Sequence, residues 1–507
     1  MYVKRVIAGC AAAVAVAALP LAQTPRAQGS FSVVEKTIPE LQAAMQAGTV
    51  TSRDLVTMYL ARIKAYDQDG PKLNAMIALN PKALDEAAAL DAERKAGRVR
   101  GPLHGIPIVV KDNYVTEDMP TTGGTKALEG FMPGRDAFMV KKLRDAGAVI
   151  VGKTNLHELA YGITTISSAG GQTHNPYDPT RNPGGSSGGT GAAVAANFAA
   201  AGMGTDTCGS IRYPSASNNL VGLRGTLGLS SRDGIIPLSH TQDIGGPLAR
   251  TVTDLAIMLD ATVGMDRNDP ITVIGSSHVP PSYRAALKPD ALKGARIGAL
   301  VPLFGTAPED AEAAAVVRAA LDVMKQHGAE VVDVQMDIDP LLQNTSVINA
   351  EFKFDLLDFL AKFPNAPVHS LGEILDSGKY GQAVEGVLRR SNQVEEREPP
   401  NALALAKRVG VKNDISTVIR GERLDALAYP TLRRKPATIG SPQVGGNCQL
   451  SATTGLPAIS MQAGFTADGL PIGLELLGFE FTEQRLLDLA YSFEQVSHNR
   501  KLPPTTP

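Results

Sequence analysis

The chain has 507 residues, of which 43% are hydrophobic and 20% are charged, a composition typical of a soluble globular protein with a large core. It carries 49 basic and 51 acidic residues, and its net charge of −2 argues against a polybasic surface for nucleic acid or anionic lipid. Three cysteines are too few for a disulfide scaffold.

The first 27 residues are typical of a secretory signal peptide. Lys4 and Arg5 precede a run rich in Ala, Val and Leu, and small residues follow, so we expect cleavage near Ala22 or Ala27. The apolar run is short for a membrane span, so we expect no stable membrane insertion, with an uncleaved anchor as the alternative. The sequence therefore predicts a periplasmic or secreted protein.

Removal of this segment changes the charge and the cysteine count. Residues 1–27 contain three basic residues and no acidic one, so the mature net charge becomes −5. Cys10 leaves with the segment, and Cys208 and Cys448 then permit one disulfide at most.

The next part of the chain predicts a helical N-terminal layer. Amphipathic helices are expected over residues 37–47, 52–66 and 81–96. Thr51 with Asp54 three residues later is close to a capping box, which favours a helix start at that point.

From Gly105 onward, short β-branched runs alternate with helical segments. Strands are expected at 106–110, 148–151, 296–300 and 329–334, with helices over about 136–146 and 309–327 between the members of each pair. Strand, helix and strand at this spacing indicate βαβ units and a sheet with parallel pairs. The fold class is therefore α/β, in one large domain over residues 28–507. Within it, residues 351–424 are expected to form a mostly helical insertion, with a solvated face at Glu395–Glu398.

Residues 147–154 match the phosphate-loop pattern G-x-x-x-x-G-K-[ST]. The four intervening residues are apolar and mostly β-branched, so they favour a strand, whereas phosphate binding needs a loop with convergent N–H groups. We therefore reject nucleotide binding and interpret Lys153–Asn155 as the turn after that strand.

Residues 184–188 match G-x-S-x-G, the nucleophile elbow of α/β-hydrolases. That fold needs an acid and then a histidine downstream, and His240, His278, His327, His369 and His498 lie in no recognisable context, so this is the weaker alternative. Zinc-protease and C-x-x-C motifs are absent from the sequence, and we expect neither a metal nor another cofactor.

Two glycine-rich segments and one lysine point to a different chemistry. Residues 183–196 combine glycines with an Ala-rich stretch suited to a buried helix. Residues 204–215 are expected to form a loop that places glycines around Ser210, where N–H groups could converge on an oxyanion. Lys111 follows five apolar residues. Burial of its amine would lower the pKa, and a neutral lysine is a competent base.

Five ordered blocks of the sequence resemble the amidase signature family. They are GPLHGIPIVVKDN, GAVIVGKTNLHELA, NPGGSSGGTGAAVAA, GTDTCGSIRYPSASNNLVGLRGT and GLPAISMQAGFTADGLPIGLELLG. The resemblance extends from about Thr37 to Arg500. It implies an α/β/α domain with a mixed central sheet, and hydrolysis of carboxamides through an acyl-serine intermediate.

The resemblance also implies a Ser, cis-Ser, Lys triad. Lys111 would be the base, Ser186 the bridging serine after a cis peptide, and Ser210 the nucleophile, with no histidine required. Backbone N–H groups of Thr207, Cys208, Gly209 and Ser210 would then stabilise the oxyanion.

Several neighbours of these residues have supporting roles in this interpretation. Asp206 and Arg212 are expected to hold the loop, and Ser187 to support it by hydrogen bonding. Cys208 departs from the glycine common at its position. We interpret it as a small residue whose N–H matters more than its sulfur, although its side chain could narrow the pocket, and a thiol nucleophile would need a nearby cation.

The sequence leaves the substrate open among simple amides, peptide amides, aryl amides, carbamates and esters. The insertion is expected to shape the substrate pocket, and Phe352, Phe354 and Phe359 there suit either an apolar acyl group or core packing. A monomer or homodimer acting on a small molecule is expected. The alternatives are an amidotransferase A-type subunit, which shares these blocks, and a non-enzymatic extracytoplasmic binding protein.

Overall fold

The computed structural model describes residues 1–2, 31–397 and 400–507 of the chain. Residues 3–30, which include nearly all of the predicted signal peptide, and Glu398 of the predicted solvated face lie outside the described residues. Residues Val33–Pro507 form one compact unit, and the description below concerns this unit. Within the described residues, no helix combines the length and apolar character that a bilayer span requires.

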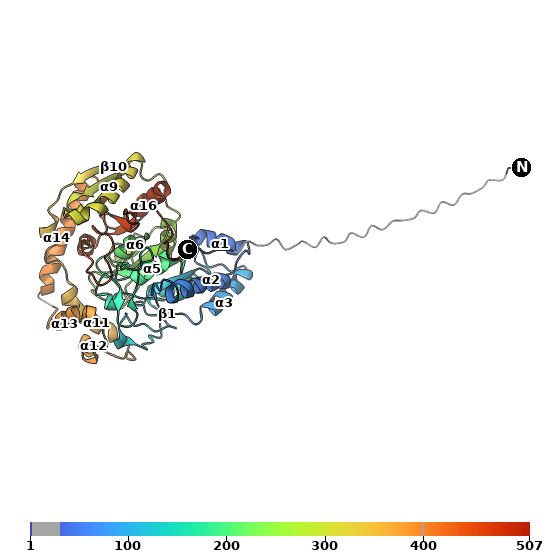
Figure 1. The fold of residues 1–507 in the computed structure, drawn as a ribbon, viewed down its shortest axis with the longest axis horizontal. Coiled ribbons are helices and arrows are strands. Elements are labelled where there is room, and N and C mark those ends of the chain that lie inside the picture. The colour runs from blue at the N-terminus through green and yellow to red at the C-terminus, as the bar shows by residue number, and fades with distance from the viewer. Residues whose placement is uncertain (3–30, 398–399) are drawn as a thin grey trace. The chain divides into compact units, whose positions relative to one another are not determined.

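The core of the unit is an 11-stranded mixed sheet, with helices packed against it (Figure 1). The strand order is β1-β3-β2-β6-β8-β7-β12-β13-β11-β9-β10, and β4 with β5 forms a separate pair. The strands are β1 (Met76–Leu79), β2 (Pro107–Lys111), β3 (Val149–Thr154), β4 (Ile166–Ser167), β5 (Gly171–Gln172), β6 (Ala201–Asp206), β7 (Val221–Arg224), β8 (Ile244–Ala249), β9 (Arg296–Leu300), β10 (Glu330–Val334), β11 (Ala426–Pro430), β12 (Ala458–Phe465) and β13 (Pro471–Leu477).

Parallel pairs lie toward the two ends of the sheet, and an antiparallel region lies between them. β3, β2 and β6 run parallel, as do β11, β9 and β10, whereas the pairs from β6 through β8, β7, β12, β13 and β11 are antiparallel. The predicted α/β class, the mixed sheet and the parallel pairing of both predicted βαβ units are therefore confirmed.

The helices include every helical segment that the sequence predicts. The α-helices are α1 (Ile38–Gln46), α2 (Ser52–Arg62), α3 (Ala83–Lys95), α4 (Phe138–Asp145), α5 (Gly188–Ala195), α6 (Arg212–Ser217), α7 (Val252–Thr262), α8 (Thr272–Ser276), α9 (Ala311–Gln326), α10 (Ile338–Leu342), α11 (Ile348–Leu360), α12 (Leu371–Ser377), α13 (Gln382–Asn392), α14 (Pro400–Gly421), α15 (Gln449–Thr454) and α16 (Glu483–Ser497). The shorter helical segments are the π-helix Ile63–Gln68 and the 3-10 turns Lys126–Leu128, Glu158–Ala160, Val301–Phe304 and Pro308–Asp310.

One local sequence signal explains where α2 begins. Thr51 and Asp54 form a complete capping box at the start of α2, as predicted. The predicted helix over 52–66 is α-helical only to Arg62 and continues as the π-helix. In Figure 1, α1, α2 and α3 lie together in blue, and α3 packs on both α2 and β3.

The predicted helical insertion is also confirmed in its described part. α11, α12 and α13 pack on one another (Figure 1), and α14 contacts α11. Phe352 and Phe359 are buried, with Phe352 packed edge-on against Tyr161. Core packing therefore accounts for these two rings, and Glu395 and Glu396 are exposed as predicted.

Two boundary predictions are wrong. Lys153 and Thr154 belong to β3 and do not form a turn, because β3 keeps pairing with β2 through Lys111↔Thr154. The segment 204–215 is mostly regular structure, because β6 runs to Asp206 and α6 begins at Arg212. Only residues 207–211 form the loop, which we call the Thr207–Ile211 loop.

Candidate active site

Sheet pairing brings the predicted lysine close to the predicted serine loop. Lys111 is the last residue of β2, and β2 pairs in parallel with β6 through Val110↔Met203. The carboxyl ends of parallel neighbours meet at one edge of a sheet. Lys111 therefore lies beside Thr205 and the start of the Thr207–Ile211 loop.

The Lys111 side chain is completely buried among hydroxyl groups. Its Nζ donates to Ser186 Oγ at 2.7 Å and to Thr205 Oγ1 at 2.7 Å. Within the described residues no carboxylate forms an ion pair with it. Burial lowers the pKa of Lys111 to about 7, although the more distant charges of Asp243 and Asp206 oppose that shift.

Ser186 lies two residues before α5 and follows a cis peptide bond, Gly185–Ser186. Its carbonyl accepts a hydrogen bond from His157 N at 3.0 Å. The His157 ring is buried in this region, and burial together with the Lys111 charge lowers its pKa to about 4. His157 is therefore a neutral neighbour of the site, and no sequence signal pointed to it.

Ser187 joins the segment before α5 to both β6 and the Thr207–Ile211 loop. Its Oγ donates to Thr205 O and accepts from Thr205 N, each at 3.2 Å. Its N–H donates to Ser210 O, also at 3.2 Å. The predicted supporting role of Ser187 is confirmed, and this contact places the backbone of Ser210 beside the Ser186–Ser187 segment.

Ser210 is 3% exposed, and its Oγ makes no hydrogen bond to any residue in the described part of the chain. The preceding Gly209 has φ +87°, and a Cβ there would lie 2.6 Å from the Tyr213 ring. Only glycine fits this position without rearrangement. The structure thus brings Lys111 and Ser186 into contact and places the Ser210 backbone beside Ser187, the residue after Ser186.

Asp206 determines which loop amides remain available. Its Oδ1 accepts from Gly209 N at 2.7 Å and its Oδ2 from Ile211 N at 3.1 Å. The N–H groups of Thr207, Cys208 and Ser210 have no acceptor among the described residues. Three of the four predicted oxyanion donors are therefore free, whereas the Gly209 N–H is already used.

Asp206 is itself held by two buried arginines, as predicted for Arg212. The Arg212 Nε donates to Asp206 Oδ2 at 3.0 Å, and Arg224 forms a second ion pair with the same carboxylate at 3.3 Å. The two guanidinium charges hold the pKa of Asp206 well below its usual range. Arg212 also pairs with buried Glu475, so the loop is fixed to β13.

Gln242 and Asp243, which no sequence pattern indicated, also hold Thr207 by hydrogen bonds. Thr207 Oγ1 donates to Asp243 Oδ1 at 2.5 Å, and Gln242 Nε2 donates to Thr207 O at 3.2 Å. Both residues directly precede β8, whose Ile244 pairs with Asp206. α11 supports this segment in turn, because Glu351 accepts from Ser239 Oγ at 2.6 Å.

A disulfide joins Cys208 to Cys448 across 240 residues, with a Cα–Cα distance of 5.1 Å. Cys448 is the residue before α15. The interpretation of Cys208 as a small residue whose N–H matters more than its sulfur did not include this bond, which gives the sulfur a structural role. The bond also removes the thiol that a cysteine nucleophile would need. The cysteine count permitted this bond, but nothing in the sequence brought the two residues together.

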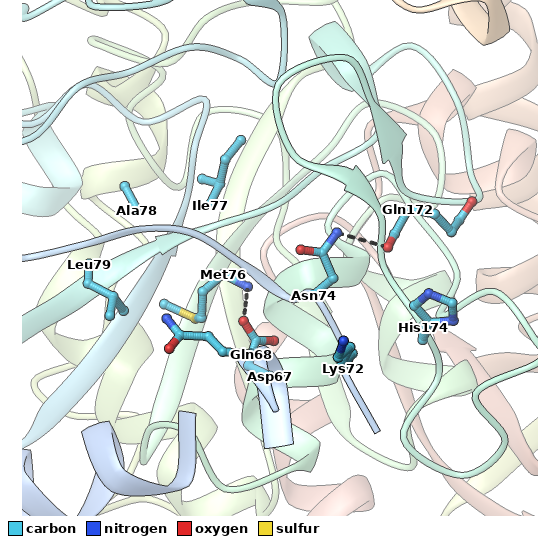
Figure 2. Close-up of a pocket in the computed structure, with 10 residues that line it drawn as sticks. All are labelled: Asp67, Gln68, Lys72, Asn74, Met76, Ile77, Ala78, Leu79, Gln172 and His174. Carbon is cyan, nitrogen blue, oxygen red and sulfur yellow. Dashed lines mark hydrogen bonds between the residues drawn. The ribbon is translucent and has the colours of Figure 1, made fainter. Parts of the chain in front are cut away.

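Figure 2 shows a separate cavity of about 510 Å³ between the π-helix, β1 and Gln172–His174. Two of its polar side chains already have partners: Asp67 accepts from Ala75 N at 2.5 Å, and Asn74 Nδ2 donates to Gln172 O at 3.0 Å. None of the predicted site residues lines it. No group of three or more His, Cys, Asp or Glu among the described residues is arranged to hold a metal ion.

Comparisons with known proteins identify the class of protein that has this fold. The family model Amidase matches residues 54–487. The crystal structure of peptide amidase from Stenotrophomonas maltophilia is 38% identical, with a TM-score of 0.87 over 94% of this chain and 99% of that one.

Curated relatives agree with this match. The A-type subunit of glutamyl-tRNA(Gln) amidotransferase from Halorhodospira halophila is 35% identical over 93% of this chain and 99% of the relative. A probable amidase from Arabidopsis thaliana is 34% identical over 94% of this chain and 93% of the relative. The chain belongs to the amidase signature family and is an amidase.

Proposed function

We propose that the chain hydrolyses carboxamides through an acyl-serine intermediate on Ser210, with Lys111 as base and Ser186 as bridge. The observation that carries this proposal is the contact between Lys111 Nζ and Ser186 Oγ at 2.7 Å, made by a fully buried lysine without an acidic partner among the described residues. An uncharged amine has a lone pair that can accept the Ser186 hydroxyl proton.

In the first step, Ser210 Oγ attacks the amide carbonyl carbon while its proton passes to Ser186 and the Ser186 proton passes to Lys111. The carbonyl oxygen becomes an oxyanion, which the free N–H groups of Thr207, Cys208 and Ser210 stabilise. The proton then returns through Ser186 to the leaving nitrogen as the C–N bond breaks. Ammonia or an amine leaves, and the acyl group stays on Ser210.

Water completes the reaction in a second step. Lys111, again uncharged, takes a proton from water through Ser186, and the resulting hydroxide attacks the acyl-serine ester. The ester bond breaks, the carboxylic acid leaves and Ser210 regains its proton.

Among amides, we propose peptide amides as the substrate class, because the peptide amidase is similar to this chain over almost its whole length.

We also propose that the protein is exported. The signal-like residues 1–27 support this proposal. So does the Cys208–Cys448 disulfide, because such bonds persist in oxidising compartments. Fractionation of cells that express the full chain tests it: the expected result is a shortened protein outside the cytoplasm, and a full-length protein in the cytoplasm would contradict it.

A panel of simple amides, peptide amides, anilides and carbamates, assayed for released ammonia or amine, tests the activity. We expect turnover of peptide amides, labelling of Ser210 by a sulfonyl fluoride, and loss of both in Ser210→Ala. Ser187→Ala is the matched control, because Ser187 neighbours the bridge but its Oγ hydrogen-bonds only to backbone atoms among the described residues. Equal turnover by Ser210→Ala would refute the assignment.

A further inference from the structure

A pocket of about 470 Å³ lies against the segment that carries Cys448. Leu303 and Ile338 supply apolar parts of its wall, and Gly446, Asn447 and Gln449 flank Cys448 on both sides. Arg433 is the basic side chain among the lining residues. The pocket therefore combines a cation with apolar walls next to the Thr207–Ile211 loop.

The Arg433 guanidinium has no hydrogen bond and no ion pair to any residue in the described part of the chain, and its Nε is buried. The adjacent Arg434 differs, because its Nε donates to Asp310 Oδ1 at 2.8 Å. A buried charged donor without an acceptor carries a desolvation cost. An anionic group entering the pocket would supply the missing acceptor.

The backbone around Arg433 is held in place before any ligand arrives. Arg433 N donates to Gly445 O at 2.8 Å, and Leu432 pairs with Gly446 in a β-bridge. Asn447 Nδ2 donates to Leu303 O at 2.7 Å and to Pro430 O at 2.8 Å. A preorganised wall of this kind reduces the entropy cost of binding.

The same wall is joined to the proposed catalytic loop. Cys448 is bonded to Cys208, and Tyr213 Oη accepts from Cys448 N at 2.9 Å. Gln449 Oε1 lies 3.6 Å from Cys208 Sγ. Through the disulfide, the Asn447 backbone is at most about 17 Å from that of Ser210, a distance that about five extended residues cover.

The charges around the pocket favour a singly charged ligand. Asp337 and Asp339 also line it and are exposed. They would repel a multiply charged anion such as phosphate more than a single carboxylate. A carboxylate also matches the two parallel N–H groups that a guanidinium presents.

We propose that this pocket is a subsite for an acidic residue in the acyl part of a peptide-amide substrate, and that Arg433 binds its carboxylate. The inference rests on the proposed function, because it places the scissile amide at Ser210. It goes further in assigning a preference for acidic peptides and a residue that sets it.

Acetylated five-residue peptide amides, each with Glu or Gln at one successive position, test the proposal. We expect the wild type to prefer Glu over Gln at one position by about tenfold in kcat/KM, mainly through KM. Arg433→Gln should bring that ratio close to one. The matched control Arg434→Gln should keep it, because Arg434 already pairs with Asp310.

Ratios near one at every position in the wild type, or a preference that survives Arg433→Gln, would overturn the subsite while leaving the proposed activity intact. Absence of any turnover would instead count against the proposed function. In that case, calorimetry measures the binding of the same peptides to Ser210→Ala. Tighter binding of the Glu peptide than of the Gln peptide, with the difference lost in Ser210→Ala/Arg433→Gln, supports the subsite. Equal binding of the two peptides to Ser210→Ala overturns it. Displacement of the Glu peptide by inorganic phosphate at similar concentration would overturn the carboxylate assignment.

Discussion

Lys111 and Lys153 lie on neighbouring strands and are both fully buried, yet their partners differ in kind. Lys153 forms an ion pair with Asp112 Oδ1 at 2.9 Å and donates to Thr121 Oγ1 at 2.9 Å. Among the described residues, Lys111 Nζ donates hydrogen bonds only to the hydroxyls of Ser186 and Thr205. In the ladder, Lys153 pairs with Val110 and Lys111 with Thr154, so the two side chains project to opposite faces of the sheet.

This difference separates a structural lysine from a candidate base. Burial lowers the pKa of both amines, but the Asp112 carboxylate opposes the shift at Lys153. Near neutral pH, Lys111 is therefore distributed between its charged and uncharged forms, while Lys153 has a carboxylate that favours the charged form. The acidic partner, and not burial alone, distinguishes the two sites.

Replacement of Lys111 by Met should have the largest effect. We expect kcat/KM for a peptide amide to fall by about 10³-fold or more, because the proton acceptor is gone. Thermal unfolding should show an intact fold, with a stability equal to that of the wild type or higher at pH 6. The pKa of Lys111 is near 7 in the folded state and about 10.4 in the unfolded state, so folding must bury a charged amine below pH 7. Lys111 therefore lowers the free energy of unfolding most below pH 7, and its removal relieves that loss.

Replacement of Lys153 by Met should instead affect stability. Removing one member of a buried ion pair leaves Asp112 uncompensated, and we expect a loss of about 3–5 kcal/mol in the free energy of unfolding, measured by urea denaturation. The double variant Lys153→Met/Asp112→Asn should recover part of the loss. A loss below about 1 kcal/mol in the single variant would show that this pair is not needed, and the contrast with Lys111 would fail.

Removal of the disulfide should have a somewhat smaller effect. A disulfide typically contributes about 2–4 kcal/mol to stability, and we expect Cys208→Ala/Cys448→Ala to lose that amount. Reductant should shift the urea midpoint of the wild type but not that of the variant. Equal midpoints for the reduced and oxidised wild type would contradict a stabilising role.

The smallest expected effect is that of Asp243→Asn. Loss of its charge should lower the pKa of Lys111 further, so the acid limb of the pH–rate profile should move to lower pH. A weaker hold on Thr207 should reduce the plateau rate by about tenfold. Thr207→Val is the matched control, because it removes the contact with Asp243 but keeps the charge, so only the plateau should fall. If the acid limb of the pH–rate profile of Asp243→Asn lies at the same pH as in the wild type, Asp243 is not coupled electrostatically to Lys111.

Local patterns predicted most of the elements, and tertiary contacts explain what they missed. Hydrophobic periodicity and capping residues located the helices and the strands of both βαβ units, because these signals are contained within short segments. The strand order could not be predicted, since β12 and β13 lie between β7 and β11 through pairing between distant segments. The end of β3 was misplaced because pairing with β2 outweighs the turn-like sequence Lys153–Asn155.

In the candidate site, too, local sequence patterns indicated some residues, and tertiary contacts determine the others. Sequence blocks alone indicated Lys111, Ser186 and Ser210. Asp206 lies in the same block as Ser210. Thr205, Asp243 and the Cys208–Cys448 bond depend on how β6, β8 and α15 are placed in space, so no local pattern indicated them. The use of the Gly209 N–H by Asp206 is likewise visible only in three dimensions.

The pH dependence of Ser210 labelling by a sulfonyl fluoride tests the central claim most directly, since it reports activation of Ser210 without substrate release. We predict a wild-type rate that rises through an apparent pKa of about 7 and then levels, and a slow, flat profile for Lys111→Met. Labelling of Lys111→Met at the wild-type rate, or a wild-type rate that rises only near the ordinary pKa of lysine, would contradict it.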